Sequence, residues 1–424
     1  MQAHQTKTKN KLLPVLKCVG YASLTLSILS SGPLYAGQAE RDEARRMHER
    51  LTGVPPTNTV LSTMEGLIVS SDPEAAAKEA MKNPAFYNVT LKNYAAPWTN
   101  EDQSVFVPLN DYSATVVGLI RDSDTVDFRE ILHGNIIYTG NVSGIAAYSN
   151  SNNDHYEQLE QKGPVDGNLA DDTILVKKTQ TEVTGLQADA TAGVMTTRAA
   201  AAAFFSAGTN RAMFRFTMMN HMCTDVDPLK DISRVPDRVR QDVSRSPGGD
   251  SRIYMFSCVG CHAGMDGLSG AFAHYEYNEG TEAMEYTPNT VTAKHLINSD
   301  NFKHGYVTVD DSWVNYWRNG QNKLLGWADK SSADLSSAGI TFDDKDHAHG
   351  NGAKSFGHEL ANSYSFARCQ VKKAYQAICL HNPDDYAADR ELIDGINGVG
   401  GITRSFMANY NMKDVFAKVA ASCR

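Results

Sequence analysis

Apolar residues recur with helical spacing along much of the chain. The clearest stripe falls within 363–380, where apolar residues are three or four positions apart and therefore share one face of a helix. It consists of Val371, Ala374, Tyr375, Ile378 and Cys379. Asp72 and Pro73 form an N-cap and first-turn pair, which predicts a helix starting there. Similar patterns predict helices over 111–120, 125–132, 199–205, 211–222, from about 355 onwards, and over 409–421.

These patterns divide the chain into segments. They are a leader over 1–36, an N-terminal helical domain over 37–140, a polar connection over 141–190, a domain over 191–345 that contains the candidate haem-binding motif described below, and a C-terminal helical region over 346–424. The connection is rich in Asn, Ser, Asp and Gly and has no sustained helical period, so we expect it to be irregular, with a short strand near 173–177. We predict a mainly α protein made of irregular, multi-helix domains.

The leader has the features of a secretory signal peptide. Four lysines lie between Lys7 and Lys17, a mostly small and apolar stretch runs from Val19 to Leu29, and Ala36 ends a suitable cleavage site. The alternative is an uncleaved membrane anchor, but the apolar stretch is short, and no later segment is long and apolar enough to cross a bilayer. We expect a periplasmic or secreted protein without a stable membrane span after cleavage.

The formal net charge is −9, and removal of the lysine-rich leader makes it more negative. This acidic balance argues against nucleic acid and anionic membrane surfaces as partners. It favours encounter with a basic partner protein, although acidic charge also serves solubility alone.

One pentapeptide carries specific chemistry: Cys258, Cys261 and His262 form the motif C-V-G-C-H. Two thiols three positions apart lie on one side of a helix, where both can form thioethers to a single haem, and the next histidine can bind the iron from below. A redox-active cysteine pair or half of a zinc site are the alternatives, but no second C-x-x-C occurs. We therefore predict one covalent haem c, with His262 as the metal ligand.

Four other cysteines remain after the leader and the motif, and they are Cys223, Cys369, Cys379 and Cys423. An even number in an exported protein predicts two disulfides, the alternative being four reduced thiols. If 363–380 is one helix, Cys369 and Cys379 lie about 15 Å apart along it and cannot bond to each other. Two connectivities stay open, each linking one of these two cysteines to Cys223 and the other to Cys423.

The second axial position of the iron decides between an electron carrier and a catalyst. A methionine thioether favours electron transfer, whereas an open site favours peroxide or oxygen chemistry. The sequence leaves Met407, Met412, His358 or no ligand as options, with His274, His295 and His304 as further histidines. Met265 shares the face of His262 and cannot reach the opposite side of the ring.

Other candidate sites are weaker. His358 and Glu359 begin a zinc-protease pattern that lacks its second histidine. The segment 343–349 has cation-binding residue types, but a hydrated loop is the simpler interpretation. Arginines upstream of the motif are candidate ion-pair partners for the haem propionates, and they are Arg240, Arg245 and Arg252. The methionines and aromatic residues of 213–222 and the tryptophans near 313–327 are expected to pack in the core.

The stretch from Cys258 to Ala273 resembles the haem segment of large exported c-type cytochromes built from domains of unknown function. Asp266, Gly267 and Leu268 follow the motif as in those proteins, although Gly267 stands where many of them have proline. Segments around 192–196, 209–211 and 108–129 also look similar. The resemblance implies a cytochrome c-like haem-binding segment, haem binding and electron transfer, and it implies no substrate.

Together these patterns predict an exported monohaem c-type cytochrome that exchanges single electrons with a redox partner protein. One alternative is a haem enzyme of the peroxidase or oxygenase type with an open distal iron site. The other is a secreted binding protein in which haem has a structural role.

Overall fold

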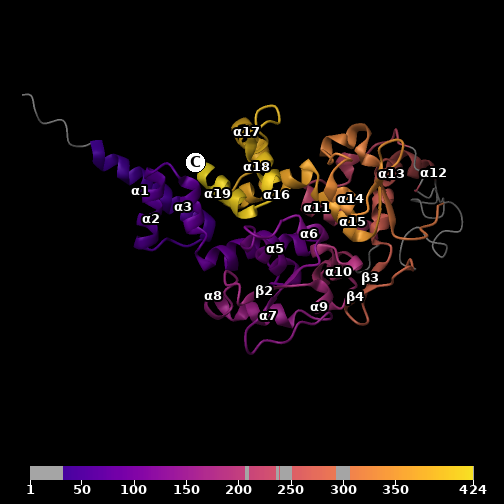
Figure 1. Ribbon diagram of the computed structural model, residues 1–424, viewed down its shortest axis with the longest axis horizontal. Helices are drawn as coiled ribbons and strands as arrows, with labels where there is room; N and C mark the ends of the chain where they lie inside the picture. Colours follow the sequence, from indigo (N-terminus) through magenta and orange to yellow (C-terminus); the bar gives the residue numbers. More distant parts are fainter. Residues whose placement is uncertain (1–31, 206–209, 235–237, 239–250, 293–305, 424) are drawn as a thin grey trace, which may run out of the picture.

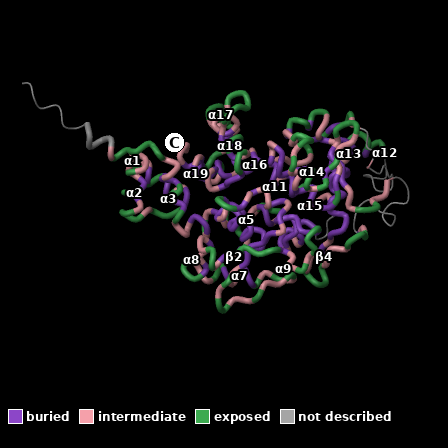
Figure 2. Tube along the Cα trace, viewed as in Figure 1, coloured by how far each residue is buried: buried purple, intermediate pink, exposed green. Residues whose placement is uncertain are grey.

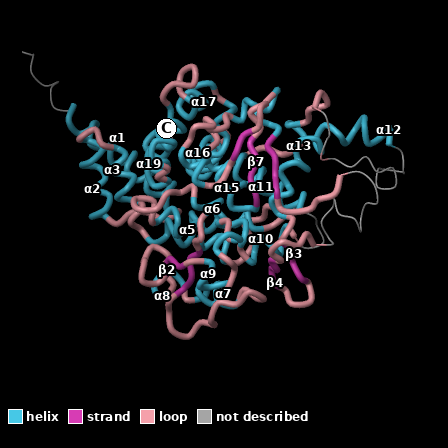
Figure 3. The backbone as a smooth tube through the Cα atoms, turned by 45° about the vertical axis from the view of Figure 1, so that its right-hand side comes forward, coloured by secondary structure: helices cyan, strands magenta, loops and turns pink. Residues whose placement is uncertain are grey.

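The structure is a computed structural model that describes residues 32–205, 210–234, 238, 251–292 and 306–423. It is mainly helical and has small antiparallel sheets, so the coarse prediction of a mainly α protein is confirmed. Figure 1 shows an elongated arrangement, with the N-terminal helices at one end and α12 (Ser251–Ile253) and α13 (Val259–Ser269) at the other. The strands are short pieces set among the helices (Figure 3).

The two ends of the described chain meet in one helical bundle. It contains α1 (Gly32–Thr52), α2 (Asn58–Val69), α3 (Pro73–Ala80) and α19 (Met412–Ser422). The predicted start of α3 is confirmed, because the Asp72 carboxylate accepts a hydrogen bond from the backbone N–H of Ala75 at 3.0 Å. The predicted leader, 1–36, lies mostly outside the described residues.

The central helix α5 (Asp111–Arg121) is buried along its whole length, as its apolar pattern predicts. The second predicted helix, over 125–132, is wrong in extent: only α6 (Glu130–His133) forms. The Asp127 carboxylate accepts from the backbone N–H of Arg129 at 2.8 Å. Such local side-chain hydrogen bonds give the backbone an alternative to helix, which accounts for the turns that precede α6.

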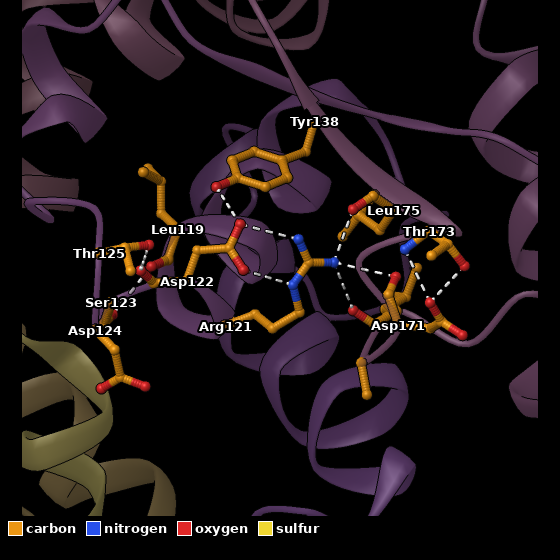
Figure 4. A network of polar contacts seen from close by, with 12 residues as sticks. Leu119, Arg121, Asp122, Ser123, Asp124, Thr125, Tyr138, Asp171, Thr173 and Leu175 are labelled. Atoms are coloured by element: carbon orange, nitrogen blue, oxygen red, sulfur yellow. Dashed lines mark hydrogen bonds and ion pairs between the residues drawn. The ribbon is translucent and has the colours of Figure 1, made fainter.

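A polar network closes the C-terminal end of α5 (Figure 4). Arg121 donates from Nε to Asp122 Oδ1 at 2.7 Å and from Nη2 to Oδ2 at 2.9 Å, and the Tyr138 hydroxyl donates to Oδ2 at 2.8 Å. The remaining nitrogen of Arg121 donates to the backbone carbonyls of Asp171 at 3.2 Å and Leu175 at 2.7 Å. The network therefore fastens the chain near Leu175 to α5.

The segment 141–190 is more ordered than its composition predicts. It contains α7 (Asp154–Gln161), α8 (Gly163–Asp166), β2 (Leu175–Lys178) and α9 (Gln180–Thr184). β2 pairs antiparallel with β1 (Ile137–Gly140), and it overlaps the expected strand. The only residues that α7 buries are His155, Tyr156 and Leu159, which are too few to produce a helical period in the sequence. The predicted domain boundaries stay a prediction.

The helices expected over 199–205 and 211–222 are confirmed as α10 (Arg198–Phe204) and α11 (Asn210–Met222). Phe214, Met218 and Met222 are buried in the core, and so are Trp313 and Trp317. Between α11 and α15 the chain also forms β3 (Tyr275–Asn278), β4 (Ala283–Tyr286), β5 (Ser312–Asn315), α14 (Ala333–Ser337), β6 (Thr341–Phe342) and β7 (Ala348–Asn351). The short helix α4 (Lys92–Ala95) precedes α5.

The C-terminal region is helical, as predicted. It consists of α15 (Gly352–Ala361), α16 (Tyr364–Cys379), α17 (Ala387–Asp394) and α18 (Gly401–Asn409), followed by α19. All residues of the predicted apolar stripe of α16 are buried. Figure 2 shows the buried residues gathered in the middle of the molecule, around α5, α11 and α15.

Two disulfides form, Cys223–Cys369 and Cys379–Cys423, which is one of the two connectivities left open by the sequence. The first joins α16 to the end of α11, and the second joins the other end of α16 to the end of α19. Such bonds are typical of an oxidising compartment outside the cytoplasm. Within the described residues, no helix combines the length and the apolar character needed to cross a membrane.

Candidate haem-attachment site

The motif lies on one helical run at the end of the molecule opposite the N-terminal bundle (Figure 1). The run begins with α12, continues through a π-helical turn, η7 (Tyr254–Cys258), and ends with α13. Cys258 closes the π turn, and Cys261 and His262 lie in the first turn of α13. Both thiols are free and half-buried. Because helical residues three apart are neighbours, the two thiols share one side of the run, as the motif predicts.

The opposite side of α13 is packed tightly against the protein. A Cβ on Gly264 would lie 2.0 Å from Trp317 Nε1, and one on Gly267 would lie 2.9 Å from the carbonyl oxygen of Val314. Only glycine permits so close an approach. With about 3.6 residues per turn, Gly267 lies on the side of α13 away from Cys258 and His262. Gly264, three positions after Cys261, lies at the border between the packed side and the thiols. The fold therefore buries one face of α13 and leaves the motif on the other.

His262 is held by a buried carboxylate one turn further along α13. Its Nδ1 lies 3.2 Å and 3.3 Å from the two carboxylate oxygens of Asp266, whose side chain has no solvent exposure. Arg211, on α11, donates from Nε to Asp266 Oδ1 at 2.5 Å and pairs through Nη2 with Oδ2. Within the described part of the chain, Nε2 of His262 makes no hydrogen bond. The ring therefore presents Nε2 to whatever occupies the motif face.

The charge on Asp266 follows from these contacts. Burial on its own would raise the pKa of this carboxyl, but the guanidinium of Arg211 and the hydrogen bond from His262 outweigh burial and lower the pKa below its ordinary value. Asp266 is therefore a carboxylate at neutral pH, and it can only accept hydrogen bonds. Arg211 donates to both oxygens of Asp266, so the carboxylate faces Nδ1 of His262 as an acceptor. For Cys261 the balance is reversed, because burial raises the pKa of its thiol.

Exposed apolar side chains flank the motif. They are Ile253, Met255 and Phe256, which precede Cys258, and Ile232, whose side chain lies beside Gly260; we call these four residues the apolar flank. Phe256 is 85% exposed, only two positions before the first thiol. A group of large, exposed apolar residues on a protein surface commonly marks a binding site. A mainly apolar macrocycle bound at the thiols would fit against this apolar flank.

Tyr254 adds a polar group to the same place. Its ring centroid lies 5.9 Å from that of His262, and its hydroxyl is buried without a hydrogen-bond partner among the described residues. Burial raises the pKa of this phenol, so it stays protonated and can donate. An unpaired buried donor is costly unless a bound group supplies an acceptor. The thiols, the bare Nε2 of His262, the apolar flank and this donor together fit a haem c.

The options for a second axial ligand lie elsewhere. Met412 is buried in the core at the start of α19, and Met407 lies on α18, at a distance from α13 in Figure 1. His358, on α15, stacks on His133 with ring centroids 3.7 Å apart. His274 is buried, with Nδ1 3.3 Å from Asp311. The structure brings none of these four residues into the surroundings of His262 that are described here.

Some predicted residues have no placement to report. His295, His304, Arg240 and Arg245 lie outside the described residues, whereas Arg252 lies exposed on α12. In the segment 343–349, Asp343 hydrogen-bonds His347 and His349. Among the described residues, no three or more His, Cys, Asp or Glu side chains are arranged so that they could hold a metal ion.

Sequence reasoning missed Arg211 as part of the site, because it lies 55 positions before Asp266. Only the packing of α11 against α13 brings the two together. The link between His262 and Asp266 did have a signal in the sequence, since residues four apart are neighbours on a helix. Comparison of the chain with protein-family models, curated proteins and solved structures gives no match.

Proposed function

We propose that this chain is an exported, periplasmic or secreted monohaem c-type cytochrome that transfers single electrons. The observation that carries the proposal is the site at Cys258, Cys261 and His262. Two free thiols share one side of a helix, and a histidine follows them whose Nε2 has no hydrogen-bond partner among the described residues. The resemblance of the segment that follows to large exported c-type cytochromes supports the same reading of the motif.

The attachment chemistry is an addition. Each thiol S–H adds across a vinyl C=C of the haem, so that the sulfur bonds to one vinyl carbon and the hydrogen goes to the other. No leaving group and no oxidant are required, but both cysteines must be reduced, as Cys258 and Cys261 are here. Four further cysteines, Cys223, Cys369, Cys379 and Cys423, are engaged in disulfides and do not compete for the haem. Cys18 lies in the predicted leader.

When bound, haem c supplies a one-electron iron couple. The protein's own contribution is to position His262 through Asp266, to cover part of the ring with the apolar flank, and to leave the site near the surface at one end of the molecule. Electron transfer requires such proximity to the surface and needs no substrate pocket. A redox partner protein with basic charge would be steered towards the acidic chain.

A haem enzyme of the peroxidase or oxygenase type is the second candidate, and one observation favours it. A carboxylate that accepts from the proximal histidine raises the basicity of the imidazole. A more basic ligand stabilises oxidised iron, which serves catalysis as well as a low-potential carrier.

An optical spectrum separates these functions. Full-length protein is matured in cells with the haem-attachment machinery, purified, and reduced with a soluble donor. A carrier shows a sharp low-spin α-band that carbon monoxide leaves unchanged. A high-spin spectrum that changes with carbon monoxide contradicts the carrier and supports the enzyme, whereas a haem that does not exchange electrons with soluble donors supports a structural role.

A further inference from the structure

Asp266 has two partners among the described residues, the guanidinium of Arg211 and the imidazole of His262. Its side chain is completely buried, whereas those of Arg211 and His262 are each 22% exposed. Arg211 approaches both carboxylate oxygens from α11, and His262 approaches the same two oxygens from within α13. The carboxylate therefore lies between a permanent cation and the histidine of the motif.

The geometry assigns one tautomer to His262. Arg211 donates through two nitrogens to both oxygens of Asp266, so these oxygens face His262 as acceptors, and the hydrogen shared with Asp266 belongs to Nδ1 of the imidazole. Nε2 then carries the lone pair. Without Asp266 the ring would be free to rotate and to exchange tautomers, and a fraction of molecules would present an N–H to the metal. A carboxylate that accepts a hydrogen bond from one ring nitrogen of a histidine orients the other ring nitrogen towards a metal in this way.

Resting on the proposed function, we propose that Asp266 is a positioning residue that holds His262 in its Nδ1–H tautomer and lowers the reduction potential of the iron. The reason for the lower potential is electrostatic. Negative charge drawn towards the imidazole stabilises the more positive, oxidised iron over the reduced iron. Arg211 holds the plane of the carboxylate and offsets part of its charge, so the effect on the iron is moderated.

A matched control exists in the same chain. Asp122 also forms a two-pronged pair with an arginine, Arg121, but its third partner is the hydroxyl of Tyr138. It follows α5, well away from α13 in Figure 1. Asp122→Asn therefore breaks an Arg–Asp pair without touching the motif, whereas Asp266→Asn breaks a similar pair and removes the charge beside His262.

The first measurement uses full-length protein made without haem attachment, in which nitrogen NMR reads the His262 tautomer. The wild type and Asp122→Asn are expected to show His262 with its hydrogen on Nδ1, and Asp266→Asn to show a mixture. A wild-type ring with its hydrogen on Nε2 would overturn the inference whether or not haem binds.

The second measurement uses haem-loaded protein, confirmed by its mass, in a potential titration. Asp266→Asn is expected to increase the ratio of reduced to oxidised iron at least tenfold at a fixed applied potential, a shift of about 59 mV for one electron. Asp266→Glu, which keeps the charge, is expected to restore most of the wild-type value, and Asp122→Asn to keep it. Equal potentials for wild type and Asp266→Asn overturn the inference while leaving haem attachment intact. A wild-type protein without haem overturns the proposed function instead, and the tautomer measurement then still decides the role of Asp266.

Discussion

Arg121 with Asp122 and Arg211 with Asp266 use the same ion pair for different ends. In both, an arginine donates through two nitrogens to the two oxygens of an aspartate. The third partner differs. Asp122 accepts a hydrogen bond from the hydroxyl of Tyr138, and Arg121 donates its remaining hydrogen bonds to backbone carbonyls (Figure 4). Asp266 instead receives the imidazole of His262.

The surroundings separate the two regions further. The Asp122 network joins α5 to β1 through Tyr138 and to β2 through Leu175, and its hydrogen bonds end within the protein, as a structural role requires. The Asp266 cluster ends in an imidazole whose second nitrogen has no partner among the described residues, next to free thiols and exposed apolar side chains. An Arg–Asp ion pair therefore says little about function on its own. The third group that hydrogen-bonds to the carboxylate is more informative.

The largest effect is expected from the thiols of the motif. Replacing Cys258 and Cys261 together with alanine removes both attachment points, so covalent haem should be lost completely, as measured by a haem stain of the denatured protein.

The matched control replaces Cys223 and Cys369, which removes one disulfide. Loop closure over a separation of 146 residues predicts a loss of about 5 kcal/mol of stability. Haem should remain on the protein that folds. If folded protein without Cys223 and Cys369 lost as much covalent haem as the variant without Cys258 and Cys261, the motif cysteines would not be the specific attachment points.

A smaller effect is expected from Asp122→Asn. The side chain of Arg121 is only 6% exposed, so it would be left buried without its counter-charge. Breaking such a pair costs about 3 kcal/mol in the free energy of unfolding, which denaturant titration measures. The haem content of the folded protein should stay at the wild-type level. A lower haem content in fully folded Asp122→Asn protein would contradict this expectation, because it would mean that the Asp122 network and the haem site are coupled.

The smallest effect is expected from Tyr138→Phe, which removes one hydrogen bond to Asp122 and keeps the ring packing. The net contribution of such a bond is about 1 kcal/mol, or somewhat more because the acceptor is charged. The same denaturant titration reads this change, and a loss as large as that of Asp122→Asn would show that the hydroxyl, rather than Arg121, is the main partner.

The parts of the fold that the sequence predicted are those with strong local signals. The stripe of α16 and the cap at Asp72 depend on neighbours within a few positions, so both were readable. α7 was missed because it lies on the surface and buries few residues, and the helix over 125–132 was overextended because Asp127 turns the backbone. Disulfide pairing needed the structure, since spacing alone left two arrangements.

The same division holds for the candidate site. Cys258, Cys261 and His262 lie within five positions, so their spacing alone predicts the site, and the four-residue spacing of His262 and Asp266 places them on one helix face. Arg211 and the apolar flank needed tertiary structure, because they depend on the packing of α11 against α13 and on the exposure of residues that sequence alone would place in a core. Chemistry held within a few positions can be read from a chain, and chemistry assembled across helices cannot.

Peptide mass spectrometry tests the central claim most directly. Full-length protein is produced in cells competent for cytochrome maturation, purified and digested, and the peptide containing Cys258, Cys261 and His262 is weighed. We predict that this peptide carries the mass of one haem and that no other peptide does. An unmodified peptide from folded protein, with both thiols still reactive towards an alkylating reagent, would contradict the account.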